Sequence, residues 1–362
     1  MTPARRTRPL GTLGTLGMAA LLSTGCGGAA SSAAPLPSTA VSVVGTAMPP
    51  SNPETAPTRP GRQGARPATR TPVSRPTRTT IPGASPTNTP GGRRRIPTTT
   101  AAAALRAPAS DVEIVLPDHP DRPARLHLPS RPAGDTVPLL IALHGSYSDA
   151  DTLAGYTDLD ALAEAAGWAV LWPQGGRVDG VRAWNAGTCC SPASEAGTDD
   201  VGYLGALLDD VLATDPIDRA EVVVVGHSNG AFMAYTVACR LADRFAAVVA
   251  VSGGLATGCE PARPISVLAV HGTGDESVAY SLGAASARRW RDLDGCSTES
   301  STDQGAVRIE TWTGCDDGVE VRLVTLAGAP HAWPGGPASA PDGFDASVEL
   351  FIWLATLAPR RA

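Results

Sequence analysis

The chain of 362 residues contains no lysine, only six histidines and no C-x-x-C motif. Without a C-x-x-C pair or a matching histidine spacing, the sequence gives little support to a zinc site. No apolar run predicts a membrane span, because the stretch at residues 9–22 is too short and too rich in glycine. Residues 27–109 lack large apolar side chains in periodic order, so they cannot bury enough surface to offset the entropy of folding.

Composition divides the chain into three parts. Residues 1–26 have a basic start, a short apolar stretch and small residues before Cys26, which is the pattern of a secretory signal peptide. Residues 27–109 are dominated by Pro, Thr, Ser, Ala, Gly and Arg, which predicts a disordered, partly polyproline linker. Residues 110–362 suffice for one large α/β domain.

The end of the signal is similar to a bacterial lipoprotein box, in which the cysteine is lipidated and becomes the mature N-terminus. Here the segment is Ser23-Thr24-Gly25-Cys26, with serine where such boxes usually carry an aliphatic residue. The resemblance implies that Cys26 anchors an exported protein to the outer face of the cytoplasmic membrane. Simple cleavage and secretion stays open as the alternative, and Arg5-Arg6 leave twin-arginine export open.

Charge is distributed unevenly along the chain. The linker carries ten Arg against the single acid Glu54, whereas residues 110–362 carry 34 acidic residues and 16 Arg, a net charge of −18. An acidic domain argues against nucleic-acid binding. The basic linker is either a solvated tether or a segment that contacts anionic lipid or cell-wall polymer.

Six cysteines remain once Cys26 is set aside, and an even number in an exported domain predicts disulfides. Adjacent cysteines bond to each other only with strain, so we expect Cys189 and Cys190 to have separate partners. Cys296 with Cys315 is the favoured pair, and the other pairings, which involve Cys239 and Cys259, stay open.

Apolar runs alternate with helical patterns through the third part of the chain. Because the runs are apolar nearly throughout, they indicate an α/β fold with a mostly parallel sheet and helices on both faces. The expected strands are 111–116, 124–128, 137–143, 168–172, 221–225, 247–251, 265–270, 306–311 and 319–325; the expected helices are 152–166, 199–213, 231–241, 284–293 and 344–357; residues 177–197 are expected to form a loop.

The segment Gly226-His227-Ser228-Asn229-Gly230 is the most informative motif. It follows a valine-rich strand and precedes a helical pattern, which is the context that a nucleophile elbow requires. The glycines let the backbone turn sharply and lift the serine hydroxyl above the sheet. The motif predicts Ser228 as a catalytic nucleophile.

A serine nucleophile needs a base and an orienting acid, which follow it in the order acid, histidine in α/β-hydrolases. Only His331 follows the last expected strand, so elimination favours it as the base. Asp275 lies in the loop just beyond a buried strand and is the expected acid, with the neighbouring Glu276 as its competitor. Backbone N–H groups of Asn229 and Ser146 are expected to form the oxyanion hole.

Six motifs occur in order along the chain: Leu143-His144-Gly145, Trp184-Asn185-Ala186-Gly187 with Cys189-Cys190, Asp199-Asp200-Val201-Gly202-Tyr203-Leu204, the elbow, His271-Gly272-Thr273-Gly274-Asp275 and His331-Ala332-Trp333-Pro334-Gly335. Together they give residues 111–357 a resemblance to the secreted poly(3-hydroxybutyrate) depolymerase and feruloyl esterase-like family of α/β-hydrolases. The resemblance implies the same triad of Ser228, Asp275 and His331, with no metal or organic cofactor, and it implies that Trp333 helps to hold the substrate. Trp184 and Trp333 are the aromatic residues expected to flank the cleft, and a place in the core stays open as the alternative for each.

The sequence therefore predicts an exported serine esterase that works through an acyl-enzyme. The ester stays open among hydroxyalkanoate polymers, feruloylated or acetylated polysaccharides and small lipid esters. A peptidase on the same fold and a cell-surface binding protein without turnover are the alternatives.

Overall fold

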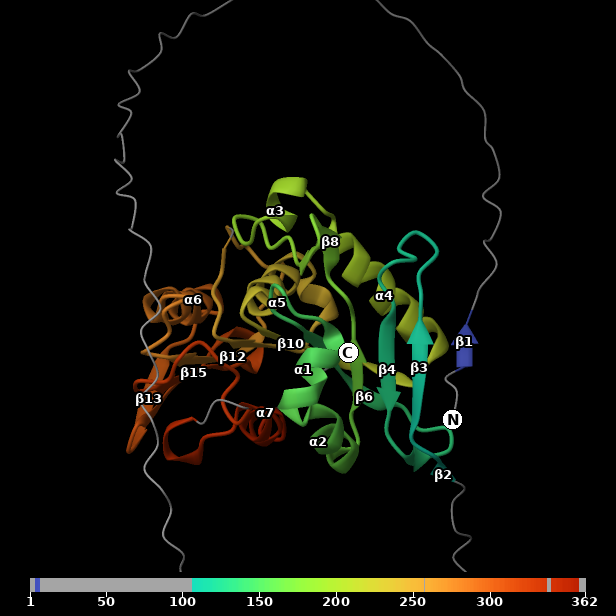
Figure 1. Cartoon of the computed structure of the whole chain (residues 1–362). Coiled ribbons are helices and arrows are strands. Elements are labelled where there is room, and N and C mark those ends of the chain that lie inside the picture. Colours follow the sequence, from blue (N-terminus) through green and yellow to red (C-terminus); the bar gives the residue numbers. More distant parts are fainter. Residues whose placement is uncertain (1–3, 7–105, 257, 337–339, 358–362) are drawn as a thin grey trace, which may run out of the picture. The chain divides into compact units, whose positions relative to one another are not determined.

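A computed structural model describes residues 4–6, 106–256, 258–336 and 340–357 (Figure 1). The chain divides into two units, one of Met1–Gly11 with Ala101–Ala362 and the other of Thr12–Thr100. Cys26, the linker up to residue 105 and all but three residues of the expected signal lie outside the described residues. Export, lipid attachment and the linker therefore stay predictions.

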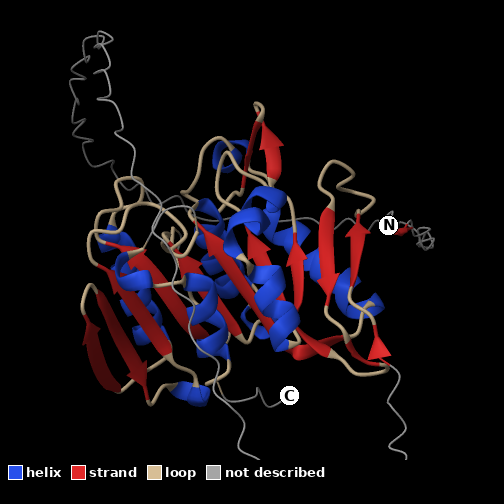
Figure 2. Ribbon diagram, turned by 60° about the horizontal axis from the view of Figure 1, so that its bottom comes forward, coloured by secondary structure: helices blue, strands red, loops and turns tan. Residues whose placement is uncertain are grey.

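An eleven-stranded sheet runs through the described part of the first unit, in the order β1-β3-β4-β7-β6-β10-β11-β12-β15-β14-β13 (Figure 2). The six strands from β7 to β15 pair in parallel, and antiparallel strands flank them on both sides. The strands are β1 (Ala4–Arg6), β3 (Ser110–Ile114), β4 (Ala124–Leu128), β6 (Val137–Leu143), β7 (Ala169–Trp172), β10 (Ile217–His227), β11 (Ala247–Val251), β12 (Ser266–Gly272), β13 (Thr298–Gln304), β14 (Val307–Thr313) and β15 (Val321–Leu326).

Helices cover both faces of this sheet. Buried side chains of α4 (Asp200–Thr214), α5 (Asn229–Arg240) and α6 (Tyr280–Leu293) form one core cluster with one face. Buried side chains of α1 (Ala150–Thr157), α2 (Leu159–Ala166) and α7 (Ala346–Leu354) form another with the opposite face. The expected α/β fold is confirmed.

The valines of β10 show why this strand lies at the centre. Val222 and Val224 pack into the first cluster, whereas Val223 and Val225 pack into the second. Successive side chains of a strand point to opposite faces, so a strand covered on both sides must be apolar at every position. The core of the fold follows directly from this run of four valines.

Four parts of the structure differ from the expected elements. The helix expected at 152–166 is broken into α1 and α2 at Asp158, whose backbone is left-handed with φ 52°. Strand β13 differs from the expectation because its seven residues are all polar and exposed at the edge of the sheet, so they show no apolar alternation. The loop expected at 177–197 contains a hairpin of β8 (Gly176–Val178) with β9 (Val181–Ala183) and the short helix α3 (Ala193–Ala196); a further small sheet pairs β2 (Arg106–Ala107) with β5 (Arg131–Pro132).

Three disulfides use all six cysteines of the folded part. The bond between Cys296 and Cys315 confirms the favoured pair. The expectation of separate partners for the adjacent cysteines is wrong, because Cys189 is bonded to Cys190. The sheet brings Cys239 at the end of α5 to Cys259, so the adjacent pair is left with no other cysteine.

A buried carboxyl group, Asp294, lies two residues before the disulfide-bonded Cys296 and predicts a pH-dependent stability. Asp294 ends α6 and is fully buried; one carboxylate oxygen accepts a hydrogen bond from the Ile265 N–H at 3.3 Å. Among the described residues its other oxygen has no partner. Burial, with a smaller contribution from Asp316, raises the pKa of Asp294 from 3.8 to about 7.

We expect Asp294→Asn to stabilise the protein above neutral pH and to leave it unchanged near pH 4. The folded state keeps a proton that the unfolded chain releases, so stability from this group is lost as the pH rises from about 4 to about 7. Three units of pKa correspond to roughly 4 kcal/mol. Urea unfolding of both proteins at pH 4.5 and pH 8 measures the difference.

The matched control is Asp292→Asn, an exposed carboxylate on the same helix. It should change the free energy of unfolding little at either pH. An equal difference between Asp294→Asn and wild type at both pH values would contradict the prediction.

Candidate active site

The backbone around Ser228 has the strained turn that the motif requires. Strand β10 ends at His227, helix α5 begins at Asn229, and Ser228 between them has φ 55° and ψ −122°. A Cβ on Gly226 would collide with the backbone of Gly230, and a Cβ on Gly230 would collide with the Leu143 carbonyl. A non-glycine residue holds such a conformation only when its surroundings enforce it, which is common at functional sites.

The fold brings the three expected side chains together above this turn. His331 follows β15 and Asp275 follows β12, so both loops lie at the same edge of the parallel sheet as the elbow. The Nε2 atom of His331 lies 2.9 Å from Ser228 Oγ. Its Nδ1 atom lies 2.7 Å from Asp275 Oδ2. Ser228, His331 and Asp275 therefore form one continuous hydrogen-bonded chain.

The carboxylate of Asp275 is held in its ionised form. Its Oδ1 atom accepts hydrogen bonds from the Ser277 and Val278 N–H groups at 2.9 and 2.8 Å. Burial by itself would raise the pKa of Asp275, but the bonds from Val278 and His331 outweigh it and hold the pKa below its ordinary value. Glu276, the competitor in the sequence, is exposed to solvent.

Two further histidines contact these three side chains, and the sequence predicts a role for neither of them. His271 is buried, and its Nε2 atom lies 2.9 Å from the Val278 carbonyl and 3.2 Å from Asp275 Oδ2. Since both partners are acceptors, Nε2 carries the proton. Burial lowers the pKa of His271, so it stays neutral and leaves the carboxylate's charge for His331. The position of His271, four residues before Asp275, is the sequence feature from which this contact could have been predicted.

The second histidine, His227, stacks on His331 with ring centroids 5.4 Å apart. Its Nδ1 atom lies 3.2 Å from the Tyr156 hydroxyl. Burial, and then the nearby His331, lower the pKa of His227 to about 3, whereas burial raises the pKa of Tyr156 to about 12. Both groups are therefore neutral at neutral pH, so this hydrogen-bonded ring supports the flat face of His331 without adding charge.

The segment of one expected oxyanion donor runs beside Ser228, and the other donor, Asn229, follows Ser228 in the chain. A Cβ on Gly145 would lie 3.3 Å from Ser228 Cβ, so the segment that includes Ser146 passes directly beside Ser228. The Tyr147 N–H donates to the Arg182 carbonyl at 3.0 Å. Within the described residues, the N–H groups of Ser146 and Asn229 donate to no backbone or side-chain acceptor, so neither donor is used by another part of that region.

The two tryptophans expected beside the cleft are buried instead. Trp184 is 0% exposed and donates its indole N–H to the His144 carbonyl at 2.9 Å. Trp333 is 2% exposed and donates to Ser347 Oγ at 3.0 Å. Neither ring offers a surface to a substrate, so the expectation that they contact it is revised. Both rings pack in the core, and each indole N–H is hydrogen-bonded inside the protein.

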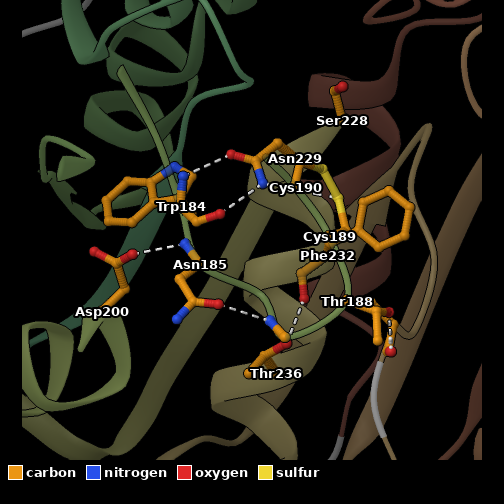
Figure 3. The surroundings of a disulfide bond; sticks show 12 residues. Trp184, Asn185, Thr188, Cys189, Cys190, Asp200, Ser228, Asn229, Phe232 and Thr236 are labelled. Carbon is orange, nitrogen blue, oxygen red and sulfur yellow. Dashed lines mark hydrogen bonds between the residues drawn. A yellow bond between two sulfur atoms is a disulfide. The ribbon is translucent and has the colours of Figure 1, made fainter. Parts of the chain in front are cut away.

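The disulfide of adjacent cysteines lies beside Asn229, the residue that follows Ser228 (Figure 3). The side-chain amide of Asn229 approaches Cys189 Sγ at 3.9 Å. Within the same loop the Ala186 N–H donates to the Cys189 carbonyl at 2.7 Å. The loop at 184–190 is thus fixed against the first turn of α5.

The described residues include no group of three His, Cys, Asp or Glu side chains that could hold a metal ion. None of the described helices is both long enough and apolar enough to cross a membrane.

Residues 123–297 match the family model described as esterase PHB depolymerase. This match and the relatives below support a resemblance to the PHB depolymerase and feruloyl esterase-like family. It is 28% identical to the bifunctional acetylxylan esterase/xylanase XynS20E of Neocallimastix patriciarum over 58% of this chain and 31% of that protein. It is 28% identical to feruloyl esterase B of Piromyces equi over 56% of this chain and 41% of that protein. The putative esterase NocK of Nocardia uniformis subsp. tsuyamanensis is also 28% identical, over 59% of this chain and 71% of its own length.

The chain thus spans less than half the length of the first two relatives. Among solved structures, the acetyl xylan esterase from Aspergillus awamori aligns with a TM-score of 0.53 at 14% identity, covering 68% of this chain and 99% of that one. This likeness, with the sheet order and the elbow, shows the α/β-hydrolase fold.

Proposed function

We propose that this protein is a serine esterase that hydrolyses carboxylic esters through an acyl-enzyme. The observation that carries the proposal is the position of His331, with one ring nitrogen 2.9 Å from Ser228 Oγ and the other 2.7 Å from Asp275. A neutral imidazole held in this way accepts the serine proton on one side while the carboxylate stabilises the cation that forms. The names of the relatives as esterases support the same chemistry.

The reaction proceeds in two balanced halves. Ser228 Oγ attacks the ester carbonyl carbon as His331 Nε2 takes the hydroxyl proton, and the carbonyl oxygen becomes an oxyanion that the N–H groups of Asn229 and Ser146 bind. His331 returns the proton to the leaving alcohol as the acyl-enzyme forms. A water molecule then attacks the acyl carbon as His331 Nε2 takes one of its protons. His331 gives that proton to Ser228 Oγ as the acyl–oxygen bond breaks, which releases the acid and restores the free serine.

For the substrate we propose an acetyl or feruloyl ester of a polysaccharide. This assignment is supported by the relatives named as acetylxylan and feruloyl esterases. Hydroxyalkanoate polyester, small lipid esters and peptide amides are the competing outcomes of the same assay.

A fluorophosphonate probe tests the proposal on the full chain. We expect a single covalent adduct, mapped by mass spectrometry to Ser228, because the probe needs an activated serine. In parallel, acetylated xylan, methyl ferulate, hydroxybutyrate polymer and a p-nitroanilide report which bond is cleaved. Absence of labelling would identify a scaffold without turnover, and amide hydrolysis as fast as ester hydrolysis would identify a peptidase.

A further inference from the structure

The side chain of Asn229 holds the backbone of Trp184 from both sides (Figure 3). Its Oδ1 atom accepts a hydrogen bond from the Trp184 N–H at 2.7 Å, and its Nδ2 group donates to the Trp184 carbonyl at 2.9 Å. Both residues are buried, with exposed fractions of 1% and 0%. The backbone N–H of the same Asn229 is one of the two oxyanion donors proposed above.

The indole of Trp184 bonds the segment that leads to the second donor, Ser146. The indole N–H donates to the carbonyl of His144 at 2.9 Å, two residues before Ser146 in the chain. The His144 ring is itself fixed between backbone groups: Nε2 accepts from the Gly175 N–H at 2.9 Å, and Nδ1 donates to the Gly145 carbonyl at 2.8 Å. Burial lowers the pKa of His144 to about 4, so the ring stays neutral and keeps both bonds at neutral pH.

The loop that carries Trp184 is anchored to the core next to it. The Asn185 N–H donates to Asp200 Oδ2 at 2.6 Å, and the buried Asp200 pairs with Arg122 at 2.5 Å. The Arg122 guanidinium in turn lies 5.6 Å from the centre of the Trp184 ring. Trp184 is therefore held in place independently of the two segments that it joins.

We propose that Trp184 is a positioning residue that holds the two halves of the oxyanion hole, at Ser146 and Asn229, at a fixed separation. This inference rests on the proposed esterase function. One residue bonds the side chain of one donor through its backbone and the segment of the other donor through its indole.

The proposed role predicts a particular kinetic signature. Oxyanion donors act most strongly on the transition state, where the carbonyl oxygen carries negative charge, and only weakly on the bound substrate. Loss of their alignment should therefore lower kcat and leave KM nearly unchanged. A tryptophan that contacted the substrate would instead change KM.

Trp184→Phe tests this in the full chain, because it keeps an aromatic ring and deletes the indole N–H. With an acetyl ester as substrate and active sites counted by fluorophosphonate, we expect kcat to fall about 10- to 100-fold, less than on loss of a whole donor. KM should stay within about twofold. The affinity for a boronic acid, whose adduct with serine is tetrahedral, should fall by about the same factor as kcat/KM.

Two comparisons separate positioning from a loss of folding. Trp353→Phe deletes another buried indole N–H bond, to Glu320 at 2.6 Å, on a helix outside the site, and should keep wild-type kcat. Benzothienylalanine at position 184 replaces the N–H by sulfur without leaving a cavity and should reproduce the loss seen with phenylalanine.

An unchanged kcat in Trp184→Phe, a rise in KM alone, or an equal loss in Trp353→Phe would overturn the proposal. Failure of the proposed esterase function is distinguishable from these outcomes. In that case the wild-type protein itself would show neither ester hydrolysis nor labelling at Ser228.

Discussion

Replacing Ser228 or His331 by alanine should lower kcat for ester hydrolysis by about a millionfold. Ser228→Ala removes the atom that forms the acyl bond, and His331→Ala removes the group 2.9 Å away that accepts its proton. Because the two side chains act as one unit, the double variant should lose little more activity than either single variant. Hydrolysis of p-nitrophenyl acetate by the purified full chain measures all three.

Controls on the same chain make this result specific. Ser281→Ala changes an exposed serine on α6, and His127→Ala changes a histidine of β4 that pairs with the surface carboxylate of Asp111. Both should retain activity. Fluorophosphonate labelling should disappear in Ser228→Ala and slow sharply in His331→Ala, whereas substantial turnover in folded Ser228→Ala would end the case for this nucleophile.

Asp275→Asn should lower kcat by about 10,000-fold while leaving the fold intact. The Oδ1 atom of Asp275 accepts two backbone N–H groups, so the new amide must place its NH2 group at the Oδ2 position. That group would face His331 Nδ1 and His271 Nε2, which both donate to Oδ2 in the wild-type protein. To accept from the amide, His331 must move its proton to Nε2, where it can no longer take the proton of Ser228.

The exposed neighbour provides the matched control for this variant. Glu276→Gln removes one negative charge one residue away and should keep wild-type kcat, since its side chain lies in solvent. Circular dichroism and thermal unfolding establish that Asp275→Asn is folded. A loss of less than tenfold in the folded variant would show that the carboxylate does not set the tautomer of His331.

Much of the site could be predicted from short segments of sequence, because the residues of the site lie where strands end. The elbow motif, the aspartate after β12 and the histidine after β15 were each expected from a short segment and from their order along the chain. In a parallel sheet the carboxyl ends of the strands meet at one edge. The structure places the three side chains in hydrogen-bonding contact there, and their catalytic role stays the proposal that the variants test.

The sequence failed where a residue's neighbours come from distant segments. The aromatic character of Trp184 fits a substrate cleft and a buried brace equally well, and only its bonds to His144 and Asn229 distinguish them. The stacking of His227 on His331 likewise joins two elements 104 residues apart. Strand β13 could not be predicted from the sequence, because an exposed polar edge strand has no alternation of apolar and polar residues.

The sequence by itself determined the α/β class, the buried strands and the identity of the three candidate catalytic residues, since strand burial and turn geometry follow from local pattern. Only the tertiary structure decided which side chains contact one another. It decided the bond between the adjacent cysteines, the contacts of two neutral histidines with His331 and Asp275, and the burial of both tryptophans. Hydrogen bonds and close packing depend on distances between segments, and those distances are set only when the whole sheet has assembled.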